Sequence, residues 1–313
     1  MSPEDKSTTT RSLVALSSSA LRLQADPACG GKLRSLVSRR TGCEYFYQDT
    51  RPAFDGTQGY SYHDISGYDE CFPTVAACCG RTPAGEMYDY ADHGSLWQQS
   101  WEVREEGSTL EMTGEASDVN CTFSRRCSFP SEDTLRLDYR VRNRGRAPVP
   151  FVYSAHPLLA ANEHTRVVLP PEMTRAFCYV SAPNSGLSDG AWFGLPCTVQ
   201  QDLVGPFSLC RRTFVKLFSD HLQEGRAAVE YPDRGERLVF TFDTAALPHL
   251  GLLAAQGHDS LGDGHFAGEY LLALEPTTGI GDDLPTCQTT GTLRTLAPGA
   301  EFAFWICLSL EEM

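Results

Sequence analysis

The segment "DTLRLDYRVRN", residues 133–143, decides the fold class. Apolar and polar side chains alternate along it, which places one set on each face of a β-strand. Runs of similar length and composition recur at residues 12–18, 236–243, 268–276 and 301–310. No segment keeps a helical period with caps at both ends. The sequence therefore predicts an all-β fold, in which many antiparallel strands form a sandwich or a closed barrel.

Three long segments rich in Gly, Ser, Asp and Pro are expected to be loops, and loops of this length in a compact domain usually carry function. They are residues 48–70, 181–196 and 254–268. None has the composition of an interdomain linker, which favours a single domain over residues 1–313. Residues 1–10 are polar and are expected to form a flexible tail.

The charge of the chain argues against several classes of partner. The formal net charge is -14 and only 26 residues are Lys or Arg, whereas a nucleic-acid surface needs basic side chains. No segment is long enough to span a bilayer, and the first thirty residues lack the apolar core of a signal peptide. The twelve cysteines include no C-x-x-C pair, so we expect reduced thiols in a cytoplasmic protein.

Two ionisable residues occupy similar places in two predicted strands. In "YLLALEPTTGIGDD", residues 270–283, Glu275 shares a strand face with apolar side chains and precedes a proline; in "PFVYSAHPLLA", residues 150–160, His156 does the same. Proline cannot continue a ladder of hydrogen bonds, so both residues are expected where a strand stops. A purely structural interpretation makes His156 a core histidine and pairs Glu275 with an arginine. A functional interpretation makes them a general acid and a general base, because partial burial brings Glu toward the neutral range where His already titrates.

Two further stretches offer groups that could contact a ligand. In "YADHGSLWQQSWEV", residues 90–103, His93 lies close to Trp97, whose ring could stack on a sugar or simply fill the core. In "ISGYDECFPT", residues 65–74, Asp69 and Glu70 are adjacent and face opposite ways in an extended chain, so at most one can enter a pocket.

One cluster of histidines and aspartates could hold a metal ion. The loop at 254–268 contains His258, Asp259, Asp263 and His265, but the spacing fits neither a calcium loop nor a helical zinc motif. We therefore expect no metal and no cofactor.

As an ordered set, several short motifs resemble the galactose mutarotase-like superfamily, also called aldose 1-epimerases. The resemblance runs from about residue 67 to the C-terminus. The motifs are "GYDECFPT", "DHGSLW", "AHPLLA", "KLF", "LPHLGLL" and "LALEPTTG".

The resemblance implies one large antiparallel β-sandwich whose concave face binds a sugar. It makes Glu275 the general base, His156 the general acid and His93 a substrate contact. Such an enzyme removes a proton from O1 of a free aldose and delivers one to the ring oxygen, so that the ring opens to an aldehyde and recloses as the other anomer. Two proton carriers on opposite sides of one pyranose suffice.

The chain departs from the best-known galactose mutarotases, which carry an Asn-Arg pair where it has "GYDECFPT". Asp69 or Glu70 is expected to take over hydroxyl recognition, and Lys216 to contribute a cation. A hexose phosphate would need several arginines, so a neutral or unusual sugar is favoured. The alternatives are a non-catalytic carbohydrate-binding or regulatory protein with the same pocket, and lyase or glycosidase chemistry that uses Glu275 with a second carboxylate.

Overall fold

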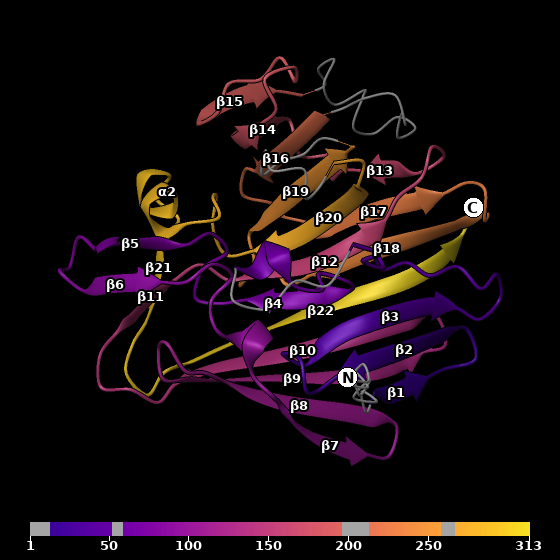
Figure 1. The fold of residues 1–313 in the computed structure, drawn as a ribbon, viewed down its shortest axis with the longest axis horizontal. Coiled ribbons are helices and arrows are strands. Elements are labelled where there is room, and N and C mark those ends of the chain that lie inside the picture. Colours follow the sequence, from indigo (N-terminus) through magenta and orange to yellow (C-terminus); the bar gives the residue numbers. More distant parts are fainter. Residues whose placement is uncertain (1–12, 52–58, 196–212, 258–266) are drawn as a thin grey trace, which may run out of the picture.

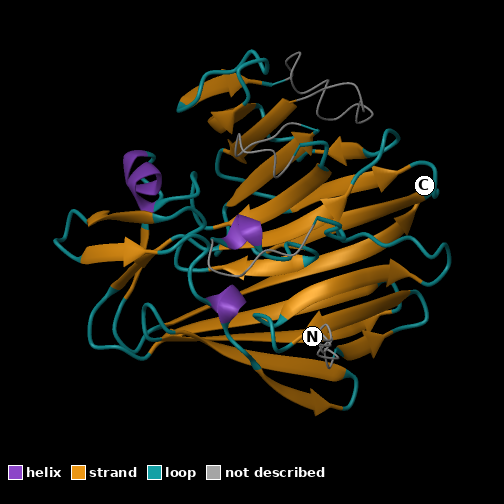
Figure 2. Cartoon of the chain, viewed as in Figure 1, coloured by secondary structure: helices purple, strands orange, loops and turns teal. Residues whose placement is uncertain are grey.

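Two large antiparallel sheets dominate the computed structural model, which describes residues 13–51, 59–195, 213–257 and 267–313. The predicted tail at 1–10 and the His-Asp cluster at 258–265 lie outside these ranges. Nearly all of the regular structure is strand (Figure 2), so the predicted all-β fold class is confirmed.

The first sheet contains ten described strands and carries the candidate site. In spatial order they are β1 (Val14–Ser17), β2 (Leu21–Asp26), β3 (Lys32–Ser38), β4 (Tyr68–Cys71), β12 (Ser154–Ala160), β20 (Tyr270–Thr277), β19 (His249–Gln256), β16 (Thr213–Ser219), β14 (Arg175–Ser181) and β15 (Ala191–Gly194).

The second sheet contains eight described strands and packs face to face with the first, which makes the fold a sandwich (Figure 1). In spatial order they are β13 (Arg166–Val168), β17 (Arg226–Tyr231), β18 (Glu236–Phe242), β22 (Glu301–Glu312), β10 (Thr134–Asn143), β9 (Cys121–Ser131), β8 (Thr109–Ala116) and β7 (Glu102–Glu106).

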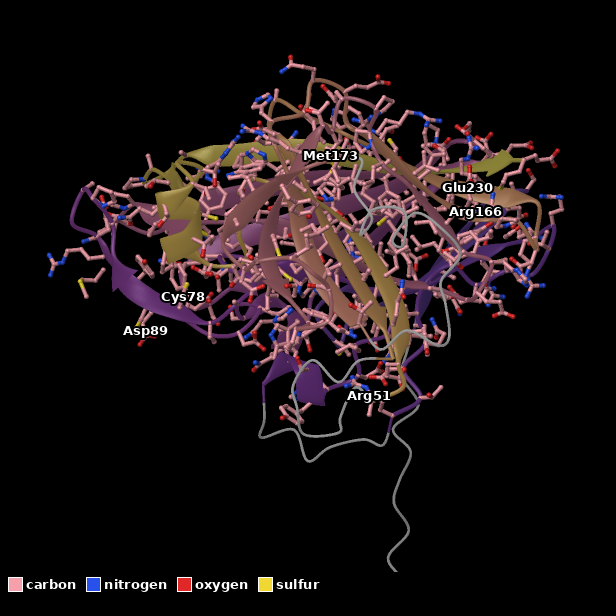
Figure 3. The ribbon with its side chains drawn as sticks, turned by 90° about the horizontal axis from the view of Figure 1, so that it is seen from above. Arg51, Cys78, Asp89, Arg166, Met173 and Glu230 are labelled. Atoms are coloured by element: carbon pink, nitrogen blue, oxygen red, sulfur yellow. The ribbon has the colours of Figure 1, made fainter. Side chains whose placement is uncertain are left out.

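The remaining elements are small. Two-stranded sheets join β5 (Cys78–Arg81) to β6 (Met87–Tyr90) and β11 (Val149–Phe151) to β21 (Arg294–Leu296), and the described helices are the 3-10 turns η1 (Tyr60–Tyr62) and η2 (Leu96–Gln98) and the α-helix α2 (Leu284–Thr289). Seen from above, the β5–β6 hairpin with Cys78 and Asp89 lies at the opposite end of the molecule from Arg166 and Glu230 (Figure 3). None of the described helices has the length and apolar character of a membrane span.

The main core lies between the two sheets, as the alternation in residues 133–143 predicts. The apolar side chains of β10 are buried in this core, together with Leu272 and Leu274 of β20. The intervening residues of β20, Leu271 and Ala273, belong to a separate apolar cluster on the other face of the ten-stranded sheet. Because side chains alternate along a strand, Glu275 shares this second face with Leu271 and Ala273.

Candidate functional site

Glu275 and His156 lie opposite each other on neighbouring strands of the ten-stranded sheet. The ladder between β12 and β20 pairs Ser154 with Thr277 and Leu158 with Ala273, and the same register sets His156 against Glu275. Their side chains therefore meet, with His156 Nε2 3.9 Å from Glu275 Oε1. Residues far apart in the sequence are brought together by strand register alone.

The expectation that both residues sit where a strand stops is wrong. His156 is the third residue of β12, which continues through Pro157 to Ala160, and Glu275 is followed by two further residues of β20. The β12–β20 pairing is interrupted between Ser154 and Leu158. The missing N–H of Pro157 falls in that interruption, so the proline does not end the strand.

Glu275 is fully buried, and only one of its two oxygens is engaged. Oε2 accepts hydrogen bonds from Lys216 Nζ and, at 3.3 Å, from Ser154 Oγ. Oε1 has no hydrogen-bond partner among the described residues. Burial raises the pKa of Glu275, although the ammonium of Lys216 acts in the opposite direction. The site thus holds a carboxylate with one oxygen free to accept a proton.

Lys216 holds two carboxyl groups in place. It lies on β16, and its ammonium pairs with Glu275 and, at 3.3 Å, with Asp282 in the segment after β20. Burial lowers the pKa of Lys216, but Asp282 and Glu275 raise it by more, so the side chain stays charged. The structural alternative for Glu275 named an arginine as partner; the partner is this lysine.

His156 is buried among cations and is not readily protonated. Burial first, and then electrostatic interactions with His93, Lys216 and Lys32, lower the pKa of His156 well below its usual value. Its Nδ1 lies 3.4 Å from the hydroxyl of Tyr60. The Tyr60 hydroxyl donates its proton to Asp69 Oδ2 at 2.7 Å, so the Tyr60 oxygen accepts a hydrogen bond from Nδ1–H of His156. In neutral His156 the lone pair is therefore on Nε2, which faces Glu275.

Asp69 supports the site from the neighbouring strand β4, where it pairs with His156 in register. Its Oδ2 also receives the ammonium of Lys32 at 2.7 Å. Burial and the negative charge of Asp69 raise the pKa of Tyr60 well above its usual range, so the phenol stays protonated. Asp69 therefore contacts the site through Tyr60.

His93 is fixed by a strained turn. Its φ of 60° lies in the left-handed region that side chains other than glycine rarely adopt. The next residue, Gly94, has no room for a side chain, because a Cβ there would lie 2.0 Å from the carbonyl oxygen of Phe72. His93 Nδ1 bonds to Asp92 Oδ1 at 2.9 Å, and its ring stacks on Tyr60 with centroids 3.8 Å apart. This leaves Nε2 of His93 available.

These side chains border a cavity of about 190 Å³ on the outer face of the ten-stranded sheet. At about 30 Å³ per molecule of liquid water this equals roughly six waters, which suits a ligand of the size of one sugar ring. The polar residues that line it are Tyr60, Ser61, Asp92, His93, His156, Lys216 and Asp282. An apolar wall completes it, formed by Ile65, Val75, Ala76, Leu158, Val180, Phe214, Leu253, Ala255 and Leu271. Glu275 is in contact with two of the lining side chains, His156 and Lys216.

Three residues expected to contact substrate do not line this cavity, and one of them is Asp69, which contacts the site only through Tyr60. Glu70 points into the core between the sheets, where its carboxylate meets Arg125 at 2.6 Å, because alternation along β4 sends it away from Asp69. Trp97 is buried behind Tyr60, against which it packs edge-on with ring centroids 5.4 Å apart. A sugar in the cavity would meet Tyr60 and His93 before it met Trp97.

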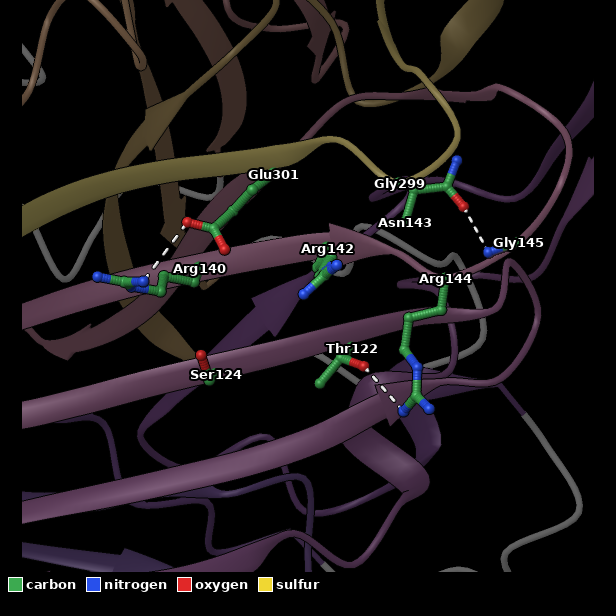
Figure 4. A pocket seen from close by; sticks show the side chains of 9 residues that line it. All are labelled: Thr122, Ser124, Arg140, Arg142, Asn143, Arg144, Gly145, Gly299 and Glu301. Atoms are coloured by element: carbon green, nitrogen blue, oxygen red, sulfur yellow. Dashed lines mark hydrogen bonds and ion pairs between the residues drawn. The ribbon is translucent and has the colours of Figure 1, made fainter.

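A larger, open hollow of about 630 Å³ lies on the outer face of the eight-stranded sheet (Figure 4). Two of its arginines form exposed ion pairs: Arg140 meets Glu301 at 3.6 Å, and Arg144 meets Glu115, outside the hollow, at 3.2 Å. Exposed pairs of this kind contribute little energy and perturb no buried group. The chemistry is therefore concentrated at the smaller cavity.

Sequence reasoning missed three residues of the site. Tyr60 stood in a segment interpreted only as a loop, and Lys32 and Asp282 carried no recognisable motif. The signal available for Asp282 was its place in "TTGIGDD", directly after the strand of Glu275. Lys32 offered none, because its pairing with Asp69 depends on how the strands are arranged.

Protein-family models and curated proteins give no match to this sequence, but solved structures share its fold. The Slr1438 protein from Synechocystis sp. PCC 6803 is 19% identical with a TM-score of 0.73, and the match covers 100% of both chains. A galactose mutarotase-like protein from Lactobacillus casei is 15% identical with a TM-score of 0.68, over 96% of this chain and 100% of that one. A galactose mutarotase related enzyme from Lactobacillus acidophilus is 14% identical with a TM-score of 0.67, over 96% and 97%. At these identities the comparison shows a galactose mutarotase-like fold, which confirms the predicted sandwich.

Proposed function

We propose that this protein is an aldose 1-epimerase that interconverts the anomers of a free aldose in the cavity beside His156. The observation that carries the proposal is the unengaged Oε1 of Glu275, 3.9 Å from Nε2 of His156. O1 and the ring oxygen of an aldose are bonded to the same carbon. An acid and a base that lie a few ångströms apart on one sheet, as His156 and Glu275 do, can therefore serve both oxygens.

The reaction moves one proton at each oxygen. Ionised Glu275 takes the proton of O1 while protonated His156 gives one to the ring oxygen, and the bond between C1 and the ring oxygen breaks to leave an open-chain aldehyde. After rotation about the C1–C2 bond, the ring oxygen attacks the other face of the carbonyl. It returns its proton to His156, and Glu275 returns a proton to O1. Each such group typically contributes 10²–10⁴-fold in rate.

The charges around the cavity favour a neutral sugar. No arginine is among its described lining residues, and the ammonium of Lys216 is already shared between Glu275 and Asp282. Among these described residues a phosphate or sulfonate group would find no free cation. His93 and Asp92 remain as hydrogen-bonding groups for hydroxyls.

Polarimetry on freshly dissolved single anomers of neutral aldoses tests the proposal. The wild-type protein should bring the rotation to its equilibrium value faster than buffer does, and His156→Ala should remove most of that acceleration. A thermal-shift screen of the same sugars and of their uronic, deoxy and sulfonated derivatives identifies which of them bind, because a ligand raises the apparent stability by mass action.

One observation favours a second candidate, a non-catalytic sugar-binding protein: Glu275 is fully buried and ion-paired, as a structural carboxylate would be. Sugars that raise the melting temperature without accelerating anomer exchange would select this candidate and reject the epimerase.

A further inference from the structure

Three side chains with metal-binding atoms converge at the inner end of the cavity. Cys71 ends β4, His93 follows β6, and His156 lies on β12; one ligand atom from each lies within 4.8 Å of the others. Cys71 is a free, fully buried cysteine, and the proposed reaction does not use it. The proposed sugar chemistry therefore does not explain why a thiol lies this close to two imidazoles.

The two imidazoles are oriented as metal ligands are. The bond from His93 Nδ1 to Asp92 Oδ1, at 2.9 Å, leaves Nε2 as the free nitrogen. A carboxylate behind a histidine is the usual outer-shell arrangement that fixes the tautomer of a zinc ligand. Nδ1 of His156 faces the hydroxyl of Tyr60 at 3.4 Å, so the lone pair of His156 is also on Nε2.

Buried carboxyl groups outnumber the buried ammonium groups beside the cluster. Three buried carboxyl groups, Asp69, Glu275 and Asp282, share two buried ammonium groups, Lys32 and Lys216. Oε1 of Glu275 also lacks a described hydrogen-bond partner. It lies 3.9 Å from His156 Nε2, so a carboxylate faces the cluster, and a water can supply the fourth ligand.

From this convergence we infer that Cys71, His93 and His156 form a Zn²⁺ site that, when filled, excludes the sugar. One thiolate, two imidazoles and an oxygen make a tetrahedral donor set that suits zinc, whereas magnesium and calcium prefer oxygen ligands. Zinc lies about 2.3 Å from sulfur and 2.0–2.1 Å from nitrogen, so the cluster contracts slightly by rotation of the Cys71 side chain. On binding, the thiol loses its proton to solvent and the S–Zn bond replaces the S–H bond.

A filled site would inhibit the enzyme, and this part of the inference rests on the proposed function. Zinc would occupy Nε2 of His156, the atom that gives its proton to the ring oxygen, and Nε2 of His93. Zinc and sugar would then compete for one cavity.

The binding test uses the reduced full-length protein and needs no sugar. Calorimetric titration with ZnCl₂ should show one tight site, and titration with CoCl₂ should give the near-ultraviolet thiolate-to-cobalt absorption of a tetrahedral site. Cys71→Ser and Cys71→Ala should both abolish that absorption and weaken Zn²⁺ binding by more than about 100-fold, since loss of an outer-shell partner alone costs 10–100-fold. The matched control is Cys178→Ser, which replaces another buried, free cysteine of the same sheet and should bind like the wild type.

A cobalt–thiolate band that persists in both Cys71 variants, or no band in the wild type, would overturn the site. Activity then tests the inhibition: Zn²⁺ should slow anomer exchange by the wild type and by Cys178→Ser, EDTA should restore it, and the Cys71 variants should resist Zn²⁺ while keeping their rate. If no anomer exchange is found, the proposed function fails, but the titrations still decide whether the metal site exists.

Discussion

Glu70 and Glu275 are both buried glutamates beside a buried cation, yet their surroundings differ in one respect. Glu70 accepts hydrogen bonds on both oxygens, from Arg125 and Tyr139 on Oε1 and from Tyr153 on Oε2. Glu275 is engaged on Oε2 only, and its other oxygen lies beside His156. A carboxylate with hydrogen bonds to both oxygens stabilises a structure, whereas one with a free oxygen beside a cavity-lining histidine can exchange a proton.

The largest effect is expected from Glu275→Gln. The amide keeps the shape of the side chain but cannot take a proton from O1, so kcat for anomer exchange should fall by about 10²–10⁴-fold. Polarimetry measures the rate, and far-ultraviolet circular dichroism checks that the variant is folded. A folded variant with wild-type kcat would mean that Glu275 is structural, as Glu70 is.

Glu70→Gln should give the complementary result. It removes the charge that compensates Arg125, and breaking a buried pair on one side typically costs about 3–5 kcal/mol of unfolding free energy. Urea denaturation measures the loss, and kcat per folded molecule should stay near that of the wild type. If Glu70→Gln lowered kcat as much as Glu275→Gln, the assignment of Glu70 as structural and Glu275 as catalytic would be wrong.

The pH dependence separates the two regions further, because only Glu275 lies beside a histidine. The proposed reaction needs ionised Glu275, whose pKa burial raises above 4.5, and protonated His156, whose pKa is lowered well below 6.5. Activity is lost as pH falls through the first value and as pH rises through the second. We therefore expect kcat/KM to form a narrow bell, because the raised pKa of Glu275 and the lowered pKa of His156 leave little room for the required pair of protonation states; stopped-flow polarimetry from pH 4 to pH 9 would record it.

Asp282→Asn sharpens this test. The negative charge of Asp282 contributes to the raised pKa of Glu275, so its removal should move the acid limb to lower pH and leave the alkaline limb in place. A wild-type plateau that extends through pH 8 would contradict the proposed acid and show that neutral His156 suffices.

The sequence predicts those features of the structure that depend on interactions between residues close together in the chain. The strands were predictable, because alternation such as that of Leu135 and Leu137 is a property of neighbouring residues. Motif resemblance also singled out His156, His93 and Glu275, which the structure brings together with Lys216. Their roles in catalysis and binding stay predictions.

What the sequence could not predict is decided by contacts between distant strands. Alternation shows that Asp69 and Glu70 face opposite ways, but only the position of Arg125 on β9 decides that Glu70 is the inward one. The same holds for Pro157, whose position within a strand depends on a gap in a ladder formed with residues more than a hundred positions away.

The smallest effect is expected at Gly251, which lies opposite Glu275 on β19. A Cβ at this position would lie 3.2 Å from both Cβ and Oε2 of Glu275, so Gly251→Ala should displace the carboxylate by a few tenths of an ångström. Misplacement by a full ångström can cost 10²-fold, so we expect kcat/KM to fall by about 10-fold.

Gly194→Ala is the matched control, because a Cβ there meets nothing within 4 Å and β15 lies at the edge of the same sheet. Steady-state polarimetry on both variants, with urea denaturation alongside, separates a displaced carboxylate from a weakened strand. Equal rates in the two variants would show that the placement of Glu275 is not critical. A general base must lie within hydrogen-bond reach of the proton that it removes. Equal rates would therefore argue that Glu275 is not the base, and the free oxygen would no longer distinguish its role from that of Glu70.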